Sequence, residues 1–185
     1  MESDYILVHK MRNGDERAME IFVGKYYSDI LNYCHYRTWD LQVAEDLTQD
    51  VFANFFRRLP MYKHRGKLAN YLYTIAGNVC KDYHRGKKEW PISVEEGRIA
   101  GVLREKGEND PAGRWAARMD IKEAVGKLPE EFQEVIVFRY FMDMKQKDIA
   151  RVCGISLPLV KYRLKQAKDK LITLLEDKEE GKHEP

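Results

Sequence analysis

The chain has 185 residues, a hydrophobic content of 44% and a formal net charge of only +2. This hydrophobic content supports folded cores and excludes a disordered chain, while nucleic-acid binding has to be argued from local rather than overall charge. No stretch approaches the roughly 18 consecutive apolar residues of a membrane helix, so we expect a cytoplasmic protein without membrane insertion. The cysteines lack metal-ligand spacing, and we expect reduced core thiols with neither metal nor cofactor: Cys34, Cys80 and Cys153.

Apolar residues recur at helical spacing along nearly the whole chain, and no long run alternates as a strand does. The expected fold class is therefore all-α, with two small helical domains joined by a flexible linker. Residues 1–88 are expected to form a four-helix N-terminal bundle. Polar caps and turn residues mark the helix starts: Ser3 or Asp4, Asp15, Asp40 and a point near Gly66.

The third and fourth helices of this bundle each have a polar outer face. The face of the third helix is compact and, taken alone, typical of a solvated surface: Asp46, Gln49, Asp50 and Ala53. The exposed side of the fourth helix mixes amide, hydroxyl, carboxylate and basic groups: Asn70, Thr74, Asn78, Lys81, Asp82 and Arg85. Such a mixture suits the reading of base edges and the holding of phosphates.

A basic loop at 61–67 precedes the fourth helix and contains an aromatic residue. Its central residues are Tyr62, Lys63, His64 and Arg65. An aromatic ring among cations is the composition that stacks an unpaired base and grips its backbone. A merely soluble turn explains the loop equally well without further context.

Periodicity lapses at 89–113, where proline and glycine punctuate a polar stretch that we interpret as the domain linker. Residues 114–176 are expected to form the C-terminal domain, with helices at about 114–127 and 129–141. Pro129 is expected at the first helical position. An amide N–H at that position has no partner within the helix, so the lack of one in proline costs no hydrogen bond. Residues 177–185 are expected to be an acidic, frayed tail.

Residues 143–171 have the pattern of a helix-turn-helix. Gly154 supplies the positive φ of a sharp turn, and Ser156 can cap the first amides of the second helix. The second helix carries basic residues beside its apolar stripe: Lys161, Arg163, Lys165 and Lys168. This arrangement suits a helix laid into a DNA major groove. An amphipathic hairpin on a solvated surface is the alternative that charge alone leaves open.

Together, the two domains resemble bacterial sigma factors of the sigma-70 family. Residues 44–52 and 71–78, followed by Asp82 and Arg85, are similar to the second conserved region of that family. Five segments of the C-terminal domain resemble its fourth region: 128–130, 138–141, 148–150, 154–156 and 160–164. The order of the two motifs and the short linker resemble the small extracytoplasmic-function (ECF) group.

The resemblance implies a specificity subunit of RNA polymerase with no active site of its own. Its partners would be the clamp helices and flap of core polymerase, promoter DNA as duplex and as melted single strand, and an anti-sigma factor as a further candidate. The implied contacts with core polymerase are Asp46, Gln49 and Asp50. Those with the minus-ten element are Tyr62, Lys63, His64, Arg65, Asn78, Lys81, Asp82 and Arg85. Those with the minus-thirty-five element are Ser156, Leu157, Leu159, Lys161, Tyr162, Arg163, Lys165 and Lys168.

Two departures from the family pattern bear on promoter preference. Gly77 stands where a basic residue is common, which weakens its helix by about 1 kcal/mol and removes a phosphate contact. Residues 157–159 replace the usual small or hydroxyl residues, and Tyr162 stands where a serine is common.

Two other classes of protein compete with the sigma-factor interpretation. A dimeric helix-turn-helix regulator that binds operator duplex without polymerase is the main alternative. An enzyme such as a nuclease is disfavoured, because the sequence has no nucleophile–base pair, metal cluster or phosphate loop at usable spacing.

Overall fold

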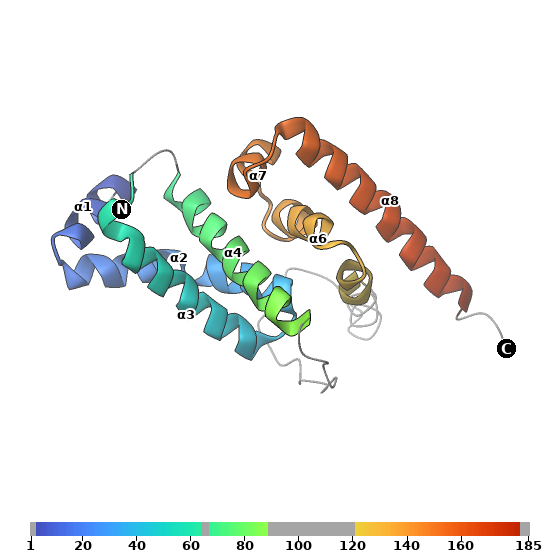
Figure 1. Ribbon diagram of the computed structural model, residues 1–185, viewed down its shortest axis with the longest axis horizontal. Coiled ribbons are helices and arrows are strands. Elements are labelled where there is room, and N and C mark those ends of the chain that lie inside the picture. The colour runs from blue at the N-terminus through green and yellow to red at the C-terminus, as the bar shows by residue number, and fades with distance from the viewer. Residues whose placement is uncertain (1–2, 64–66, 89–120, 182–185) are drawn as a thin grey trace, which may run out of the picture.

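A computed structural model describes residues 3–63, 67–88 and 121–181, with side chains to 86 and 175 in the last two ranges. Within these ranges all regular structure is helical, as expected for an all-α fold. The N-terminal helices lie on one side of the molecule and the C-terminal helices on the other, with α8 outermost (Figure 1). The expected linker and the loop residues His64 and Arg65 lie outside the described residues.

Four helices form the N-terminal bundle: α1 Asp4–Arg12, α2 Glu16–Thr38, α3 Leu41–Arg58 and α4 Leu68–Lys88, with a short 3₁₀ turn, η1 Leu59–Met61, after α3. The side chains of Ser3, Asp15 and Asp40 accept hydrogen bonds from backbone N–H groups in the first turns of α1, α2 and α3. These three predicted caps are confirmed. Each satisfies an amide that has no partner within its helix, so the polar residues fix where the helices begin.

Aromatic rings fill the centre of the bundle. The ring of Phe22 on α2 stacks on Phe55 of α3 at a centroid distance of 4.5 Å, and Phe52 and Phe56 lie edge-on to it. Large rings bury much apolar area per residue, so a small bundle gains a substantial core from a few side chains. This core presents α3 and α4 to the surface as rigid elements.

The C-terminal region consists of a helical segment at 121–126 followed by four elements: α6 Glu130–Ile136, the π-helical η2 Val137–Phe141, α7 Gln146–Cys153 and α8 Leu157–Gly181. Two details of the prediction were wrong. Pro129 is the N-cap of α6 and not its first helical residue, and the helix changes to π geometry at Val137 instead of continuing to Phe141 as an α-helix.

The helix α8 continues to Gly181 and so includes the first residues of the predicted acidic tail. The half-buried side chains of Leu171 and Leu174 pack against the core near this end of the helix. Glutamate and lysine, which dominate the next residues, are good helix formers, so the helix propagates into the charged segment.

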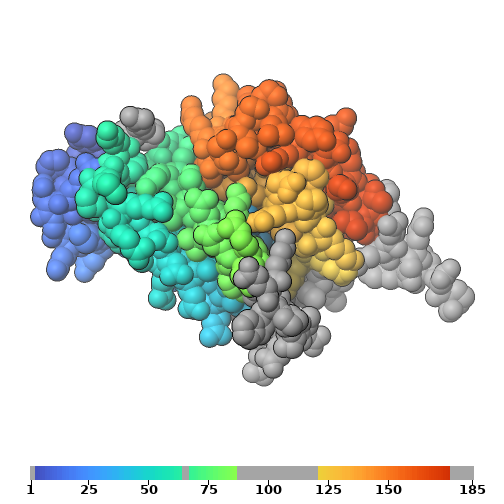
Figure 2. Space-filling model, in the orientation of Figure 1, coloured from blue at the N-terminus to red at the C-terminus, as the bar shows by residue number. Residues whose placement is uncertain are grey.

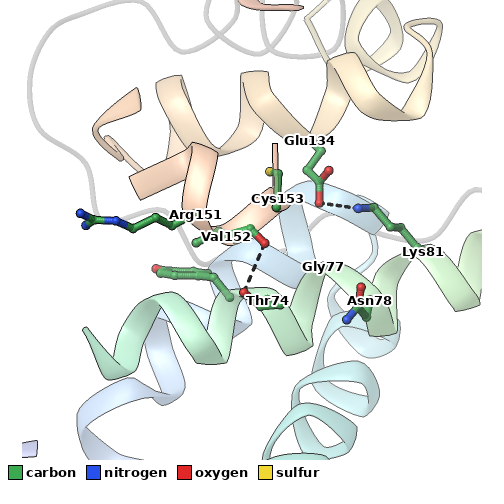
Figure 3. Close-up of a pocket in the computed structure, with 10 residues that line it drawn as sticks. Thr74, Gly77, Asn78, Lys81, Glu134, Arg151, Val152 and Cys153 are labelled. Carbon is green, nitrogen blue, oxygen red and sulfur yellow. Dashed lines mark hydrogen bonds and ion pairs between the residues drawn. The ribbon is translucent and has the colours of Figure 1, made fainter. Parts of the chain in front are cut away.

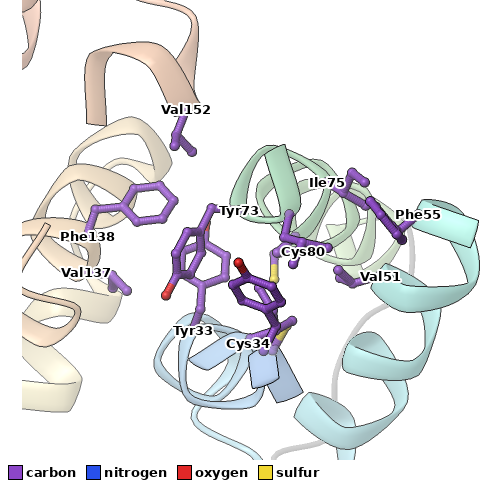
Figure 4. Close-up of a cluster of buried hydrophobic side chains, with 14 of the residues drawn as sticks. Tyr33, Cys34, Val51, Phe55, Tyr73, Ile75, Cys80, Val137, Phe138 and Val152 are labelled. Carbon is purple, nitrogen blue, oxygen red and sulfur yellow. The ribbon is translucent and has the colours of Figure 1, made fainter. Parts of the chain in front are cut away.

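The two regions pack directly on each other, which the sequence did not indicate. Phe138 of η2 stacks on Tyr33 of α2 at 4.7 Å and meets Tyr73 of α4 edge-on at 5.7 Å (Figure 4). A second aromatic contact joins Phe141 to Tyr36 at 4.6 Å. Figure 2 shows the green surface of α4 in contact with the yellow and orange C-terminal helices. The buried residues of both regions therefore form one continuous hydrophobic cluster.

Candidate nucleic-acid interface

The helix-turn-helix has the geometry that its sequence predicts. Gly154 ends α7 in the left-handed region with φ 66°, and its N–H bonds to the carbonyl of Ala150. The Ser156 hydroxyl accepts from the Leu159 N–H at 3.4 Å, which caps the start of α8. Buried apolar residues on the inner faces of both helices hold their crossing: Ile149, Val152, Val160, Leu164 and Ala167.

The outer face of α8 is open to solvent. Four residues of the predicted minus-thirty-five set are exposed there: Lys161, Tyr162, Lys165 and Lys168. Tyr162 is 57% exposed, and Leu159 lies at the edge of the same face. The face thus combines cations for phosphates with an aromatic and an aliphatic group that can touch base edges.

Arg163 is placed differently from its neighbours on α8. It is half-buried and lines a groove with the α6 carboxylates of Glu130, Glu131 and Glu134. Its guanidinium therefore lies on the side of α8 that faces α6, and not in the middle of the exposed basic face.

The polar face of α3 is exposed along its whole length. Asp46, Gln49 and Asp50 all lie in solvent, while Leu47 and Val51 on the opposite side are buried in the bundle. The face carries two carboxylates and one amide on a helix that the core holds rigid. This is a geometry suited to docking a partner with complementary charge.

The candidate minus-ten residues fall into two groups. Asn78, Asp82 and Arg85 are exposed on α4, where Arg85 pairs with Asp82 at 3.2 Å, and Lys63 is exposed before the helix. Tyr62, in contrast, is only 7% exposed. Its ring packs on Tyr71 at 4.7 Å and on Phe55 at 6.1 Å, so in this arrangement it belongs to the core and offers no free face to a base.

The N-terminal half of α4 is covered by α7, although Asn70 and Thr74 were expected on an exposed side. The Asn70 amide donates to Asp148 at 3.2 Å. The Thr74 hydroxyl donates to the Val152 carbonyl oxygen at 3.2 Å, as Figure 3 shows. The ammonium of Lys67 lies 2.9 Å from the second oxygen of Asp148. The hydrogen bond from Lys67, supported by that from Asn70, holds the pKa of the Asp148 carboxyl below its ordinary value.

A second charged contact lies farther along α4 and involves residues that sequence reasoning missed. Lys81 pairs with Glu134 of α6 at 2.9 Å, and the Glu134 side chain is 4% exposed. Arg37 of α2, only 2% exposed, lies 4.0 Å from Glu134 and 3.5 Å from Glu130. In the sequence, Glu134 stands directly before the apolar run 135–138. A carboxylate beside such a run is buried only if it has a charged or hydrogen-bonding partner, and this position is the signal that could have indicated the ion pair.

Gly77 permits this contact. A Cβ atom at residue 77 would lie 3.1 Å from the Glu134 carboxylate, which is tighter than most contacts of a Cβ atom, and at an ordinary contact distance of 3.5 Å from the Tyr33 hydroxyl. The departure from the family pattern at this position therefore leaves room for the Glu134 carboxylate of α6 beside α4.

A cavity of about 200 Å³ lies between the two regions beside these contacts (Figure 3). Its lining includes Asn78, Lys81, Glu134 and Cys153. Burial raises the pKa of the Cys153 thiol to about 12, so this cysteine is a neutral thiol and a poor nucleophile at neutral pH. All three cysteines are free thiols, as expected.

No group of three or more histidine, cysteine, aspartate or glutamate side chains is placed to hold a metal ion in the described part of the chain. Likewise, none of the helices in the described ranges is long and apolar enough to cross a membrane.

Comparison with protein families assigns both regions. Residues 22–89 match the model of Sigma-70 region 2, and residues 118–171 match that of Sigma-70, region 4. The chain belongs to the sigma-70 family. The N-terminal bundle is thus its region 2 and the C-terminal helices are its region 4, as the resemblance of the motifs predicted.

Named relatives place the chain in the ECF group of this family. It is 28% identical to RNA polymerase sigma factor YlaC of Bacillus subtilis over 82% of this chain and 88% of the relative. It is 25% identical to ECF RNA polymerase sigma factor SigW of the same organism, over 92% and 95%. RNA polymerase sigma-H factor of Pseudomonas aeruginosa is 26% identical over 91% of each chain.

Solved structures share the fold. CnrH, in complex with the cytosolic domain of CnrY, matches with a TM-score of 0.71 at 24% identity, over 95% of this chain and 99% of that one. The sigma factor RpoE, in complex with the anti-sigma factor NepR from Bartonella quintana, matches with a TM-score of 0.66 at 20% identity, over 85% and 96%. The arrangement of helices is therefore shared with CnrH and RpoE.

Proposed function

We propose that this sigma factor binds core RNA polymerase and directs transcription from promoters that it recognises at two elements. The observation that carries the proposal is the presence, in one chain, of two different candidate DNA-facing helices. The α8 helix presents an exposed row of cations with the ring of Tyr162, and α4 presents amide, carboxylate and cationic groups. A regulator that only reads duplex operator DNA needs the first of these surfaces and has no use for the second.

Region 4 would read the minus-thirty-five element as intact duplex. The exposed Lys161, Lys165 and Lys168 would contact phosphates, and Leu159 and Tyr162 would touch base edges in the major groove. Leucine cannot donate to a phosphate as threonine does, so residues 157–159 are where we expect promoter preference to depart from that of relatives.

Region 2 would melt and hold the minus-ten element. Asn78, Lys81, Asp82 and Arg85 would bind a flipped base and its flanking backbone, aided by the loop 61–67. Flipping costs a few kcal/mol of stacking and pairing, which hydrogen bonds and stacking in a protein pocket offset. Nucleotide addition would belong to the polymerase, and the complex would act in the cytoplasm.

The α3 face would dock on the clamp helices of the polymerase, with Asp46, Gln49 and Asp50 as its contacts. Region 4 would bind the flap, which sets its distance from region 2 on the promoter. An anti-sigma factor stays a predicted partner.

Run-off transcription on a genomic fragment library tests the proposal. With core polymerase added, we expect transcripts from a limited set of fragments that share two spaced elements. The free protein is expected to bind duplex promoter DNA weakly. Tight, dimeric binding to duplex without polymerase, together with no transcripts, would instead support an operator-binding regulator.

A further inference from the structure

Two of the three cysteines meet inside the N-terminal bundle. Cys34 lies on α2 and Cys80 on α4, and both side chains are fully buried. Their sulfur atoms lie between these two helices (Figure 4), where the two thiols are hydrogen-bonded to each other. Each is a free thiol. Two thiols in direct contact, on helices that are far apart in the sequence, are the starting point from which a disulfide can form without a large movement of the backbone.

We propose that Cys34 and Cys80 form an oxidative modification site, at which a hydroperoxide converts the two thiols to a disulfide that joins α2 to α4. Hydrogen peroxide is the oxidant of smallest size and the one with which the site is tested. The disulfide is independent of what the protein does. Its consequence for transcription rests on the proposed function, because α4 carries the residues assigned to the minus-ten element.

The two thiols differ in acidity, and Cys34 is the one that attacks the oxidant. The hydrogen bond from Cys80 lowers the pKa of the Cys34 thiol, although burial acts in the opposite direction. The same hydrogen bond, together with burial, raises the pKa of the Cys80 thiol. The buried guanidinium of Arg37, one turn after Cys34 on α2, favours the thiolate at this place. The thiolate is the nucleophilic form of cysteine, so the more acidic thiol reacts first.

The reaction takes place in two steps and consumes one peroxide. The Cys34 sulfur attacks one peroxide oxygen, the O–O bond breaks, and the leaving hydroxide takes up the thiol proton as water. Cys34 is then a sulfenic acid. The Cys80 sulfur attacks the Cys34 sulfur, the S–O bond breaks, and the departing hydroxide takes the Cys80 proton as a second water. Two electrons pass from the pair of sulfurs to the peroxide, which is the only oxidant required.

The third cysteine lacks both properties of this pair. Cys153 lies on α7 and lines the cavity beside the Glu134 carboxylate. Its high pKa keeps it protonated at neutral pH, and its hydrogen-bonding partner is a carboxylate that cannot form a disulfide. Cys153 is more exposed than Cys34 and Cys80. It is therefore an internal control that separates the effect of a neighbouring thiol from that of simple access.

Peroxide reaches the pair only when the bundle opens locally, because both sulfurs are buried in the core. The C-terminal half of α4 is held to α2 by the hydrogen bond of 2.9 Å between the His84 ring and the carbonyl of Arg37. Helix ends open more readily than the centre of a core, so we expect this half of α4 to admit the oxidant. Oxidation is then slow, and it reports a lasting exposure to peroxide instead of a brief pulse.

The disulfide changes the position of the DNA-facing part of α4. Bonded sulfurs lie about 2.05 Å apart, closer than hydrogen-bonded thiols, so the bond draws α4 toward α2 at Cys80. Asn78, Lys81 and Asp82 are within two residues of Cys80 and move with it. Hydrogen bonds to a flipped base weaken steeply as their distance and angle change. Oxidation should therefore reduce capture of the minus-ten strand.

The disulfide is tested on the free, reduced 185-residue chain after treatment with hydrogen peroxide. The remaining thiols are alkylated in denaturant, and the chain is digested with trypsin without reductant. We expect mass spectrometry to find peptides 26–37 and 68–81 linked to each other, and alkylation of Cys153 alone. A folded chain that keeps three free thiols would overturn the site, as would one that links Cys153 as readily as it links Cys34 to Cys80.

Two variants separate the pair from the third thiol. Cys34→Ala removes one member of the pair, and Cys153→Ala removes a thiol outside it. Circular dichroism establishes that each variant is folded, and the peptide measurement on wild type does not depend on either. After peroxide, Cys153→Ala should carry the linked peptides as wild type does, while Cys34→Ala should keep Cys80 as a thiol. A disulfide between Cys80 and Cys153 in folded Cys34→Ala, formed as fast as the wild-type bond, would contradict the assignment of Cys34 as its partner.

The effect on transcription is measured after the oxidant has been removed and before core polymerase is added. On a promoter found by run-off transcription, oxidised wild type should give about ten-fold less transcript, which corresponds to the loss of one or two hydrogen bonds, and dithiothreitol should restore it. Cys153→Ala should respond in the same way, and Cys34→Ala should give the same amount of transcript before and after peroxide. Undiminished transcription by a linked wild-type chain would overturn the effect on α4. Reduced wild type that supports no transcription would instead contradict the proposed function, whatever the peptides show.

Discussion

The helices α4 and α8 carry similar chemistry but differ in what covers them. Both place cations beside groups that can read bases, yet α4 contacts α7 through Asn70, Thr74 and the nearby Lys67, while the basic face of α8 meets only solvent in the described part of the chain. Composition does not distinguish the two faces. What distinguishes them is that region 4 has acids at the positions that meet α4, and region 2 presents nothing to the outer face of α8.

The largest expected effect comes from removing the ring at the centre of the contact between regions. Phe138→Ala should lower the free energy of unfolding by about 3–5 kcal/mol, because it leaves a cavity between Tyr33 and Tyr73. Urea unfolding followed by circular dichroism measures this loss. Tyr140→Ala is the control, since Tyr140 lies in the same π-helical segment but is 56% exposed, and its removal should change stability by less than about 0.5 kcal/mol. A Phe138→Ala protein as compact as wild type would show that the cover over α4 does not depend on this ring.

The next effect concerns the polar face of α3, which is exposed to solvent. Asp50→Lys should weaken binding to core polymerase about ten-fold without loss of fold, because the side chain is exposed and the substitution reverses a charge at the proposed contact. Fluorescence anisotropy with core polymerase measures the affinity. Glu20→Lys reverses an exposed charge on α2 and should leave the affinity unchanged.

The effect of Asp50→Lys on polymerase binding can also be measured in a protein that already carries Glu134→Gln. Since Asp50 is exposed on α3 and takes part in none of the contacts between the regions described above, its effect should be the same factor in wild type and in Glu134→Gln. A factor that differs between the two backgrounds would show that the α3 face is coupled to the contact between the regions.

A smaller effect is expected on the open face of α8. Lys165→Ala should reduce transcription from promoters with a minus-thirty-five element a few-fold, and lower the dependence of binding on salt by about one counterion. Arg163→Ala should act in the same direction if its guanidinium reaches phosphate, but less strongly, because Arg163 is half-buried beside the α6 carboxylates. Templates that lack the element are the control, and an equal loss on them would contradict a role in reading it.

The smallest expected effect is on the pKa of one carboxyl group, that of Asp148. Lys67→Met removes the main hydrogen bond that lowers the pKa of Asp148, so that pKa should rise toward its ordinary value of about 3.9. The groups that remain beside the carboxylate are Asn70 and Arg151. Carbon-detected NMR of the carboxyl group measures the titration, with Lys63→Met, an exposed cation in the preceding loop, as the control.

The direction of this pKa shift determines how the contact between the two regions depends on pH. A carboxyl whose pKa is lowered in the closed state stabilises that state above its ordinary pKa, and the contribution is lost as pH falls through the lowered value. Wild type should therefore resist opening at more acidic pH than Lys67→Met does. Equal acid midpoints by scattering would show that the Lys67 pair does not contribute to closure.

Local signals in the sequence predicted much of the fold. Ser3, Asp15 and Asp40 cap helices where their side chains suggested, and Gly154 takes the left-handed conformation that the turn requires. These features depend on residues a few positions away in the sequence, so periodicity and capping rules can predict them. The change to π geometry at Val137 was not predicted, because no local preference marks it.

The sequence predicted the exposure of some candidate residues and not of others. The exposed faces of α3 and α8 follow from helical spacing around a buried stripe, so Asp50 and Lys165 lie where the pattern placed them. Tyr62 and Thr74 do not. Tyr62 packs on Tyr71 and Phe55 of its own bundle, and Thr74 is covered by Val152, which is 78 residues away in the sequence. Periodicity identifies the side of a helix that faces its own bundle, but not a second body that packs on the opposite side.

By itself, the sequence determined the helices, the two regions and the family to which they belong, since capping, periodicity and short motifs are properties of neighbouring residues. Only the tertiary structure decided that region 4 closes on region 2. Closure depends on Glu134 meeting Lys81 across more than fifty residues of chain, and on Gly77 leaving room for that carboxylate. Long-range contacts of this kind have no local signature, because their partners are brought together only by the packing of whole helices.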